Sequence, residues 1–532
     1  MNNKKINLKK SPFIELFIFG ICFIIFLYII IPPTIVGSDS FYHAKLAELI
    51  QEKGLVKDFP WMQFTTYKDI FVDHHFGYHF ILSWFLKIPS PNNLGPLSLE
   101  IEPFLKTEIA TAFFGALFFL GLYIFLRKIK IKLPVFWTFL MLTLPKFIGR
   151  LSLIRAPAIS IIIMLLGVYC IIKKKYLGLL LTLFIYVWMY GAWPLMFIII
   201  FLYFIAEIIK NRSFKKILSI QNLKIIIFAS IGALAGLILN PYFPKTFPFY
   251  FFQTIQIAVL GTSKVAIGAE WYPPDFLNFL IYNLPLIIVW IISTAWFIIK
   301  ENKQKIINWF LFLISIFFLL FTLKSGRNID YFIPFSIIFS GLMFSQIFKT
   351  ANWPKIKKHF SSLFLTSQKQ IYAIFTIIIS FILIFFIGFY IKNGIFYIRD
   401  IHENAPLISH LQAPLNWLKK NSNPKTIVFH RSWDMFPKLF YFNKKNYYIN
   451  GLDQNFFYAN NKEKYKTWLK INQRKINPKK LGEILKNTFN ASYIISDKKS
   501  SREADKKFNI FLEKSGLEKI YNSPNASIYK IE

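Results

Sequence analysis

An aspartate and a histidine stand four residues apart in the segment GSDSFYHAKL, residues 37–46, directly after the first long apolar run. If this segment is helical, Asp39 and His43 share one face, because residues four apart are neighbours on a helix surface. A carboxylate in this place can bind a divalent cation or accept a proton from an acceptor group. The structural alternative is that Asp39 caps the N-terminus of the helix.

A second polar segment, FVDHHFGYHF at residues 71–80, holds three of the eight histidines of the chain. Its ionisable side chains are Asp73, His74, His75 and His79. Such groups suit metal or phosphate ligation. Their spacing matches no standard metal motif, so an interfacial helix with polar anchors is an equal alternative. We count Asp73 and His75, together with His43, as catalytic candidates.

Two arginines, Arg150 and Arg155, lie in the segment GRLSLIRAP between two apolar runs. Arginine at the centre of a membrane helix costs about 2.5–3.5 kcal/mol on insertion scales, so arginine next to hydrocarbon needs an anionic partner or must extend to the interface. We expect these two side chains to bind phosphate. Extension toward the lipid head groups is the alternative.

Further acids and an arginine occur in two later segments. GAEWYPPD, residues 268–275, carries Glu270, and SGRNIDYFIP, residues 325–334, carries Arg327 and Asp330. If these groups converge with Asp39 and the other arginines on one face of the membrane, they can hold a metal ion and a pyrophosphate.

The composition requires a lipid environment for the elements that position these residues. Hydrophobic residues make up 55% of the 532 residues, 62 residues are Phe, and the mean hydropathy is +0.44. The usual soluble chain has roughly 45–50% apolar residues. The net charge of +36 does not indicate nucleic-acid binding, because much of the basic charge lies in short clusters between apolar runs. Both cysteines, Cys22 and Cys170, fall within such runs, which argues against a disulfide framework or a zinc site.

The apolar runs predict a polytopic α-helical membrane protein with about eleven to thirteen transmembrane helices. Eleven runs are long enough to be considered, at residues 12–33, 108–126, 133–147, 152–172, 176–191, 194–209, 224–240, 276–299, 307–324, 328–348 and 369–392. Basic residues before the first run place the N-terminus in the cytoplasm. If the chain crosses the membrane at each run, the connections that return to the cytoplasmic side are all basic. All the candidate residues then fall on the non-cytoplasmic side.

Two external loops and a C-terminal domain complete the expected organisation. The loops, residues 34–107 and 241–275, belong to a membrane domain of residues 1–398 and include interfacial helices. From residue 399 to residue 532 the chain becomes polar, with short β-like runs at 426–430, 446–450 and 491–496. This pattern predicts an extracytoplasmic α/β domain. No internal repeat supports a transporter built from two halves.

This layout resembles the catalytic subunit of oligosaccharyltransferases and, more broadly, the GT-C membrane glycosyltransferases that use polyprenyl-phosphate sugars. In that family an aspartate after the first helix binds the metal and helps to activate the acceptor, and Asp39 matches its position. A glutamate in a late external loop reaches the same centre, as Glu270 would here. An arginine at the external end of a late helix contacts the lipid-linked phosphate, and Arg327 is similar in placement.

The resemblance is incomplete at two points. The family's external domain opens with a Trp-Trp-Asp motif that binds the acceptor, whereas this chain has Ser432, Trp433 and Asp434. The family also has an acidic pair between the third and fourth helices, where this chain has Arg150 and Arg155. The resemblance implies a site for Mg or Mn at Asp39 and Glu270, while the departure suggests that arginines neutralise the phosphates directly.

These features predict a multi-pass glycosyltransferase of the plasma membrane. It would transfer a sugar or oligosaccharide from a polyprenyl-phosphate or pyrophosphate donor to a protein or glycan acceptor on the non-cytoplasmic face, in contact with membrane lipids. Asp39 and Glu270 would serve the acceptor, and the arginines would stabilise the departing phosphate. The alternatives are a transporter or flippase of lipid-linked saccharides and a non-catalytic scaffold derived from a glycosyltransferase.

Overall fold

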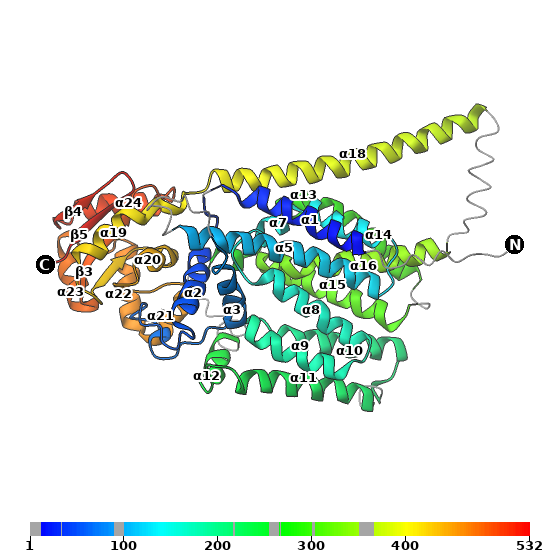
Figure 1. Ribbon diagram of the computed structural model, residues 1–532, viewed down its shortest axis with the longest axis horizontal. Coiled ribbons are helices and arrows are strands. Elements are labelled where there is room, and N and C mark those ends of the chain that lie inside the picture. Colours follow the sequence, from blue (N-terminus) through cyan, green and yellow to red (C-terminus); the bar gives the residue numbers. More distant parts are fainter. Residues whose placement is uncertain are drawn as a thin grey trace.

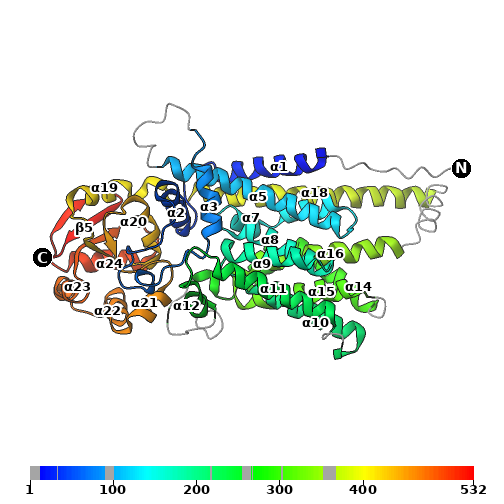
Figure 2. The same cartoon turned by 60° about the horizontal axis from the view of Figure 1, so that its bottom comes forward.

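A helical bundle and a small α/β domain make up the protein (Figure 1). The structure is a computed structural model that describes residues 12–32, 34–89, 101–215, 219–254, 265, 268–300, 304–350 and 367–532. The strands lie at one end of the molecule, and the long helices run side by side away from them (Figures 1 and 2). The α-helical membrane class with a C-terminal α/β domain, predicted from the sequence, is confirmed.

Long apolar helices form most of the bundle. Among the described residues, five spans are long and apolar enough to cross a membrane: α1 (Pro12–Ile30), α5 (Glu102–Lys128), α11 (Ile220–Ile238), α15 (Ile306–Lys324) and α16 (Ile329–Thr350), which follows the 3-10 turn η7 (Gly326–Asn328). The bundle also contains α8 (Pro157–Ile172), α9 (Tyr176–Met189), α10 (Leu195–Asn211), α12 (Thr246–Tyr250) and α18 (Ser367–Glu403). Helix is present in all eleven predicted runs, although fewer than eleven pass this test of length and composition.

Two predicted spans are broken at prolines. The run at 133–147 forms α6 (Pro134–Leu140), η2 (Met141–Thr143) and the start of α7 (Pro145–Leu151). The run at 276–299 forms α13 (Phe276–Tyr282) and α14 (Leu284–Ile299), which meet at 86° and would give a sixth span if counted together. Pro145 and Pro285 lack an N–H and disfavour helical backbone in the residue before them.

The first long loop, which the sequence predicts to be external, contains the two expected helices, α2 (Asp39–Lys53) and α3 (Phe76–Phe85), and a 3-10 turn, η1 (Thr66–Lys68). Between α2 and η1 the loop adds to the edge of the C-terminal sheet, where the Tyr448 N–H donates to the Trp61 carbonyl at 2.7 Å and the Gln63 N–H donates to the Tyr448 carbonyl at 3.0 Å. The loop therefore connects the bundle to the α/β domain.

The C-terminal domain is built on one mixed five-stranded sheet in the order β2-β1-β3-β5-β4. Strands β1 (Ile427–His430), β2 (Tyr447–Tyr448) and β3 (Ala491–Asp497) are parallel and match the three predicted β-like runs, and β4 (Lys519–Asn522) and β5 (Ala526–Lys530) add antiparallel. The surrounding elements are η8 (Ile408–Leu411), α19 (Gln412–Asn421), η9 (Trp433–Met435), α20 (Phe436–Phe442), α21 (Gln454–Asn460), α22 (Lys462–Asn472), η10 (Pro478–Lys480), α23 (Leu481–Phe489) and α24 (Glu503–Glu513). Helix α23 buries Leu481, Leu485 and Phe489, a four-residue spacing that makes one apolar stripe.

Aromatic packing joins the domain to the bundle through α2. The Phe59 ring lies 5.1 Å from the Phe440 ring of α20, and the Phe41 ring of α2 lies 5.4 Å from the Tyr441 ring. One hydrophobic cluster runs without interruption from α1 through α2 to α20. Helix α2, which begins at Asp39, is thus held from both sides.

Candidate functional site

Arg150 is held by two carboxylates from distant parts of the chain. It lies in the last turn of α7, and its Nε and Nη2 donate to the Oδ1 and Oδ2 atoms of Asp330 at 2.5 and 2.9 Å. Its Nη1 donates to Glu270 Oε2 at 3.0 Å. Asp330 stands in the first turn of α16, and Glu270 in the 3-10 turn η5 (Ala269–Trp271). The fork-shaped pairing fixes Arg150 in both position and plane.

Arg155 links the same glutamate to the first external loop. Its Nη2 donates to Asp39 Oδ2 at 2.6 Å and its Nη1 donates to Glu270 Oε2 at 3.2 Å. The predicted convergence of Asp39 and Glu270 is therefore present, with Arg155 between them. Ser38, and not Asp39, occupies the N-cap position of α2, so the capping alternative does not describe Asp39.

Arg327 completes the group but is bound more loosely. Its Nη1 lies 3.8 Å from Glu270 Oε1, and its guanidinium lies 4.1 Å from the centre of the Trp271 ring. Side-chain exposure is 28% for Arg327 and 33% for Asp39, against 18% for Arg150. Arg327 is thus the cation of the group that an incoming anion can recruit at least cost.

The charges of this group balance. Burial alone would raise the pKa of Glu270, but the guanidinium groups of Arg327, Arg155 and Arg150 lower it to about 2. Glu270 is therefore ionised at neutral pH, and three arginines face the three carboxylates of Asp39, Glu270 and Asp330. Arg150 and Arg155 each have a carboxylate partner within the protein.

A cavity of about 310 Å³ lies beside Arg150. Lys146 and Arg150 line it together with the apolar side chains of Val36, Leu153, Phe279, Ile329, Ile398 and Ile401. The Lys146 ammonium group lies 4.8 Å from the centre of the Tyr282 ring. Two cations next to an apolar wall suit a ligand that has an anionic head and a hydrocarbon tail.

The polar segment at residues 71–80 forms a buried chain of hydrogen bonds. His79 Nδ1 lies 2.7 Å from Asp73 Oδ2, and His79 Nε2 lies 2.7 Å from His43 Nδ1. The His75 ring is 5.4 Å from the His43 ring, and its backbone N–H donates to Asp73 Oδ1 at 3.0 Å. Burial, followed by the charges of neighbouring histidines and of Arg155 or Arg327, lowers the pKa of both His43 and His75. The candidates His43, Asp73 and His75 are thus brought together.

The donor set does not fit a divalent metal. Both oxygens of Glu270 face guanidinium groups, and Asp39 Oδ2 is paired with Arg155. Within the described part of the chain, no group of three or more His, Cys, Asp or Glu side chains could hold a metal ion. The Mg or Mn site at Asp39 and Glu270 stays a prediction.

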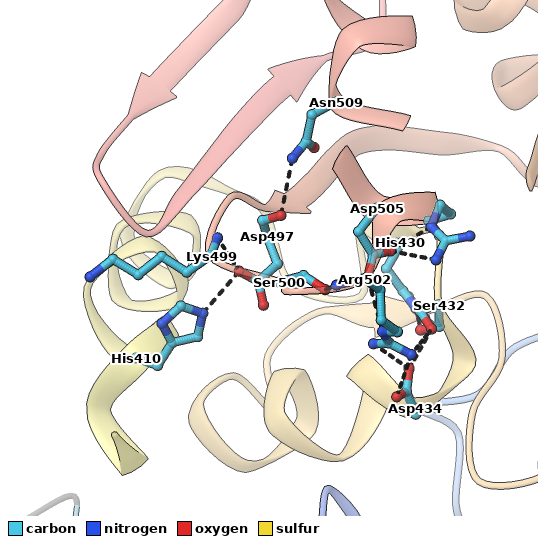
Figure 3. A network of polar contacts seen from close by, with 11 residues as sticks. His410, His430, Ser432, Asp434, Asp497, Lys499, Ser500, Arg502, Asp505 and Asn509 are labelled. Carbon is cyan, nitrogen blue, oxygen red and sulfur yellow. Dashed lines mark hydrogen bonds and ion pairs between the residues drawn. The ribbon is translucent and has the colours of Figure 1, made fainter. Parts of the chain in front are cut away.

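Trp433 and Asp434 lie near the Glu270 loop but have different surroundings. A side chain at Gly268 would have its Cβ 3.8 Å from the Trp433 ring. Asp434 accepts hydrogen bonds from Ser432 and, at 2.8 Å, from Arg502 (Figure 3). Together with Ser38, the neighbour of Asp39, Asp434 and Arg502 line a small polar pocket. Arg502 therefore holds Asp434 at the edge of the site.

One acidic residue of the site was missed in the sequence. Asp453 precedes α21, where its Oδ1 accepts from the Asn455 N–H at 2.8 Å. Burial raises its pKa, and its carboxylate is close enough to interact electrostatically with Arg327 and Asp39. In the segment NGLDQNFF it has the appearance of a helix cap, and only the docking of the domain on the bundle reveals this neighbourhood.

Comparison with solved structures supports the resemblance seen in the sequence. No family model and no curated protein matches the chain. The apo oligosaccharyltransferase of Archaeoglobus fulgidus superposes with a TM-score of 0.61 at 13% identity, over 98% of this chain and 75% of that one. The same enzyme tethered to an acceptor peptide with the NVT sequon gives 0.60 at 14% identity, over 98% and 74%. ArnT from Cupriavidus metallidurans, bound to undecaprenyl phosphate, gives 0.53 at 9% identity, over 98% of both chains. The chain therefore has the fold of the oligosaccharyltransferase-like GT-C membrane glycosyltransferases.

Proposed function

We propose that this protein is a membrane glycosyltransferase. It transfers a sugar or oligosaccharide from a polyprenyl-phosphate or pyrophosphate donor to an acceptor on the non-cytoplasmic face. The observation that carries the proposal is the meeting of Asp39, Glu270, Arg150, Arg155 and Arg327, which come from four separate segments of the chain. The fold adds support, since undecaprenyl phosphate is bound to ArnT and an acceptor peptide is tethered to the archaeal enzyme.

The cavity beside Arg150 suits the donor. Its apolar wall would take the first part of the polyprenyl chain, and Arg150 and Lys146 would face the phosphate. As the sugar leaves, negative charge grows on the phosphate oxygen, and preorganised guanidinium groups stabilise that charge. Arg327 would add to this by exchanging its 3.8 Å contact with Glu270 for the phosphate.

Asp39 is our candidate for the group that orients the acceptor and takes its proton. The bond between the acceptor atom and the anomeric carbon forms while the bond from that carbon to the phosphate oxygen breaks. The electron pair of the broken bond stays on the phosphate. Glu270 would keep Arg150 and Arg155 in place, and Trp433 and Asp434 would border the space for the acceptor.

The proposal is tested with polyprenyl-linked sugars that carry a fluorophore in the lipid tail, because loss of the sugar is then visible whatever the acceptor is. Purified protein in nanodiscs would be incubated with each donor and a cell-envelope extract as the source of acceptor. We expect conversion to the free lipid phosphate, reduced at least tenfold in Arg327→Gln. The matched control is Arg127→Gln. Arg127 lies in the last turn of α5, where it pairs with Glu15 of α1. Labelled donor that crosses a vesicle bilayer with its sugar still attached would instead support a flippase and overturn the proposal.

A further inference from the structure

The chain Asp73, His79, His43 runs from a fully buried carboxylate to the helix that begins at Asp39. The exposed fraction is 2% for Asp73, 0% for His79 and 6% for His43. Asp73 is itself fixed, because its Oδ1 accepts from the His75 N–H while its Oδ2 contacts His79. Polar groups this deeply buried are retained only when they are hydrogen-bonded.

The carboxylate determines the direction of the chain. Asp73, when ionised, can only accept, so His79 must carry its proton on Nδ1. A neutral His79 then has a bare Nε2, which accepts the hydrogen bond from His43 Nδ1 at 2.7 Å. The remaining nitrogen of His43, Nε2, is left with a free lone pair. The tautomers of His79 and His43 are thus fixed by their hydrogen-bond partners, Asp73 and His79.

His43 lies next to the ion network of the proposed active site. It is one helical turn from Asp39 on α2, a spacing that places the two side chains on one face. Arg155, which bonds both Asp39 and Glu270, is close enough to affect His43 electrostatically. A proton leaving Asp39 therefore has a buried base one helical turn away on the same helix.

A protonated Asp39 would leave part of the Arg155 charge without its partner at 2.6 Å. Returning Asp39 to the ionised state restores this pair, so a second proton acceptor favours the reaction. An imidazolium at His43 would in turn be stabilised through His79 by the buried charge of Asp73.

We propose that His43 is a second catalytic residue of the transferase, with His79 and Asp73 as positioning residues that fix its tautomer. The proposal rests on the function proposed above. The acceptor gives its proton to Asp39, and the proton then passes to Nε2 of His43, directly or through one water molecule. No oxidant or further reactant is needed, and the proton leaves to solvent before the next turnover.

Substitutions along the chain test this relay. We expect His43→Gln to lower kcat by about 10²-fold or more, the usual contribution of a positioned proton-transfer group, with KM nearly unchanged. Asp73→Asn should lower kcat less, and the double variant should be no slower than His43→Gln alone, because Asp73 acts through His43. His410→Gln is the matched control, as this histidine also pairs with an aspartate, Asp497 at 2.9 Å, in the α/β domain.

The pH profile distinguishes the relay from a structural role. The charged and titratable groups facing His43 are Tyr42 from α2, His74, His75, Tyr78 and His79 from the second segment, and Arg155, while Asp39 stands one helical turn away on α2. Their net effect, with burial, is to lower the pKa of His43, so the acidic limb of kcat should lie below pH 6.5. Asp73→Asn should move this limb further down, because the imidazolium loses its buried counter-charge.

Each outcome separates the relay from the function on which it rests. Wild-type turnover with an unchanged kcat in well-folded His43→Gln overturns the relay and leaves the transferase intact. The relay is also overturned if the two substitutions lower kcat additively in the double variant and Asp73→Asn leaves the acidic limb of kcat in place. Such a result would indicate that both side chains contribute only through packing. Absence of turnover in the wild type, despite binding of fluorescent undecaprenyl phosphate, contradicts the proposed function itself.

Discussion

Arg150 joins three elements of the site, α7, η5 and α16, through its pairs with Glu270 and Asp330. Replacing it by Gln leaves Asp330, which is 4% exposed, as a buried charge without its bidentate partner. Breaking a buried pair on one side costs about 3–5 kcal/mol. We expect Arg150→Gln to lower the apparent free energy of unfolding in detergent by this amount.

The comparison for this measurement is Arg127→Gln. The Arg127–Glu15 pair is 32% and 37% exposed, and exposed pairs contribute about 0–1 kcal/mol. Equal losses of stability in the two variants would contradict the prediction that Arg150→Gln leaves the Asp330 charge buried without a partner.

Glu270 gives a prediction about acid stability. Its folded-state pKa of about 2 lies below its ordinary value of 4.5, so its contribution is fully present above pH 4.5 and is lost as the pH falls toward 2. The stability difference between wild type and Glu270→Gln should therefore be constant above pH 4.5 and shrink below it. Thermal unfolding followed between pH 2.5 and 7 measures this, and a difference that stays constant throughout would disprove the shift.

At the same scale, the sequence predicted which residues gather on one face of the molecule, but it did not predict which side chain pairs with which. Asp39, Glu270 and Arg327 could be gathered in advance because the basic clusters assign them to one side. The fork between Arg150 and Asp330 depends on how α7 approaches α16 across a gap of 180 residues. The hydrogen bond between His43 and His79 likewise depends on the docking of α2 on α3, and no local pattern announces it.

Among the elements, α9 and α11 approach each other most closely at a glycine. A Cβ at Gly232 would lie 2.2 Å from the backbone oxygen of Leu180, so a side chain there forces the helices apart. Small residues allow such close packing in membranes. Gly232→Ala should destabilise the bundle by about 1–3 kcal/mol, the usual range for overpacking.

Gly20→Ala in α1 is the matched control, because a Cβ there meets nothing within 4 Å. It should leave the melting temperature unchanged or raise it slightly, since alanine is the better helix former. Equal melting temperatures for the two glycine variants would contradict the claim that Gly232 is needed for the close packing of α9 on α11.

The breaks in the helices show where an element-level prediction reached its limit. The hydropathy average located all eleven helical runs, because hydrophobic residues dominate the average over a window. It did not find the 86° bend between α13 and α14, although Pro285 lies beside that bend. A window average treats proline as one weakly polar residue, while in the helix it removes a hydrogen bond and adds a clash.

The whole molecule has a direction that the sequence predicts, with the N-terminus cytoplasmic and the α/β domain outside. Cysteine labelling tests it cleanly, because Cys22 and Cys170 are 0% and 3% exposed. Lys466→Cys, at a side chain 60% exposed in the domain, should react with an impermeant maleimide in intact cells. Lys128→Cys, at the end of α5, should react only after the membrane is opened. The reverse pattern would move the whole site to the cytoplasmic face.

The most direct test of the account separates donor binding from sugar transfer in one substitution, Asp39→Asn. Fluorescent polyprenyl-linked sugar should bind this variant within about threefold of wild type, since the cavity and Arg327 are untouched, while the rate of sugar loss from the lipid falls by about 10²-fold or more. Transfer at the wild-type rate in Asp39→Asn would contradict the claim that the charged group around Glu270 is an active site.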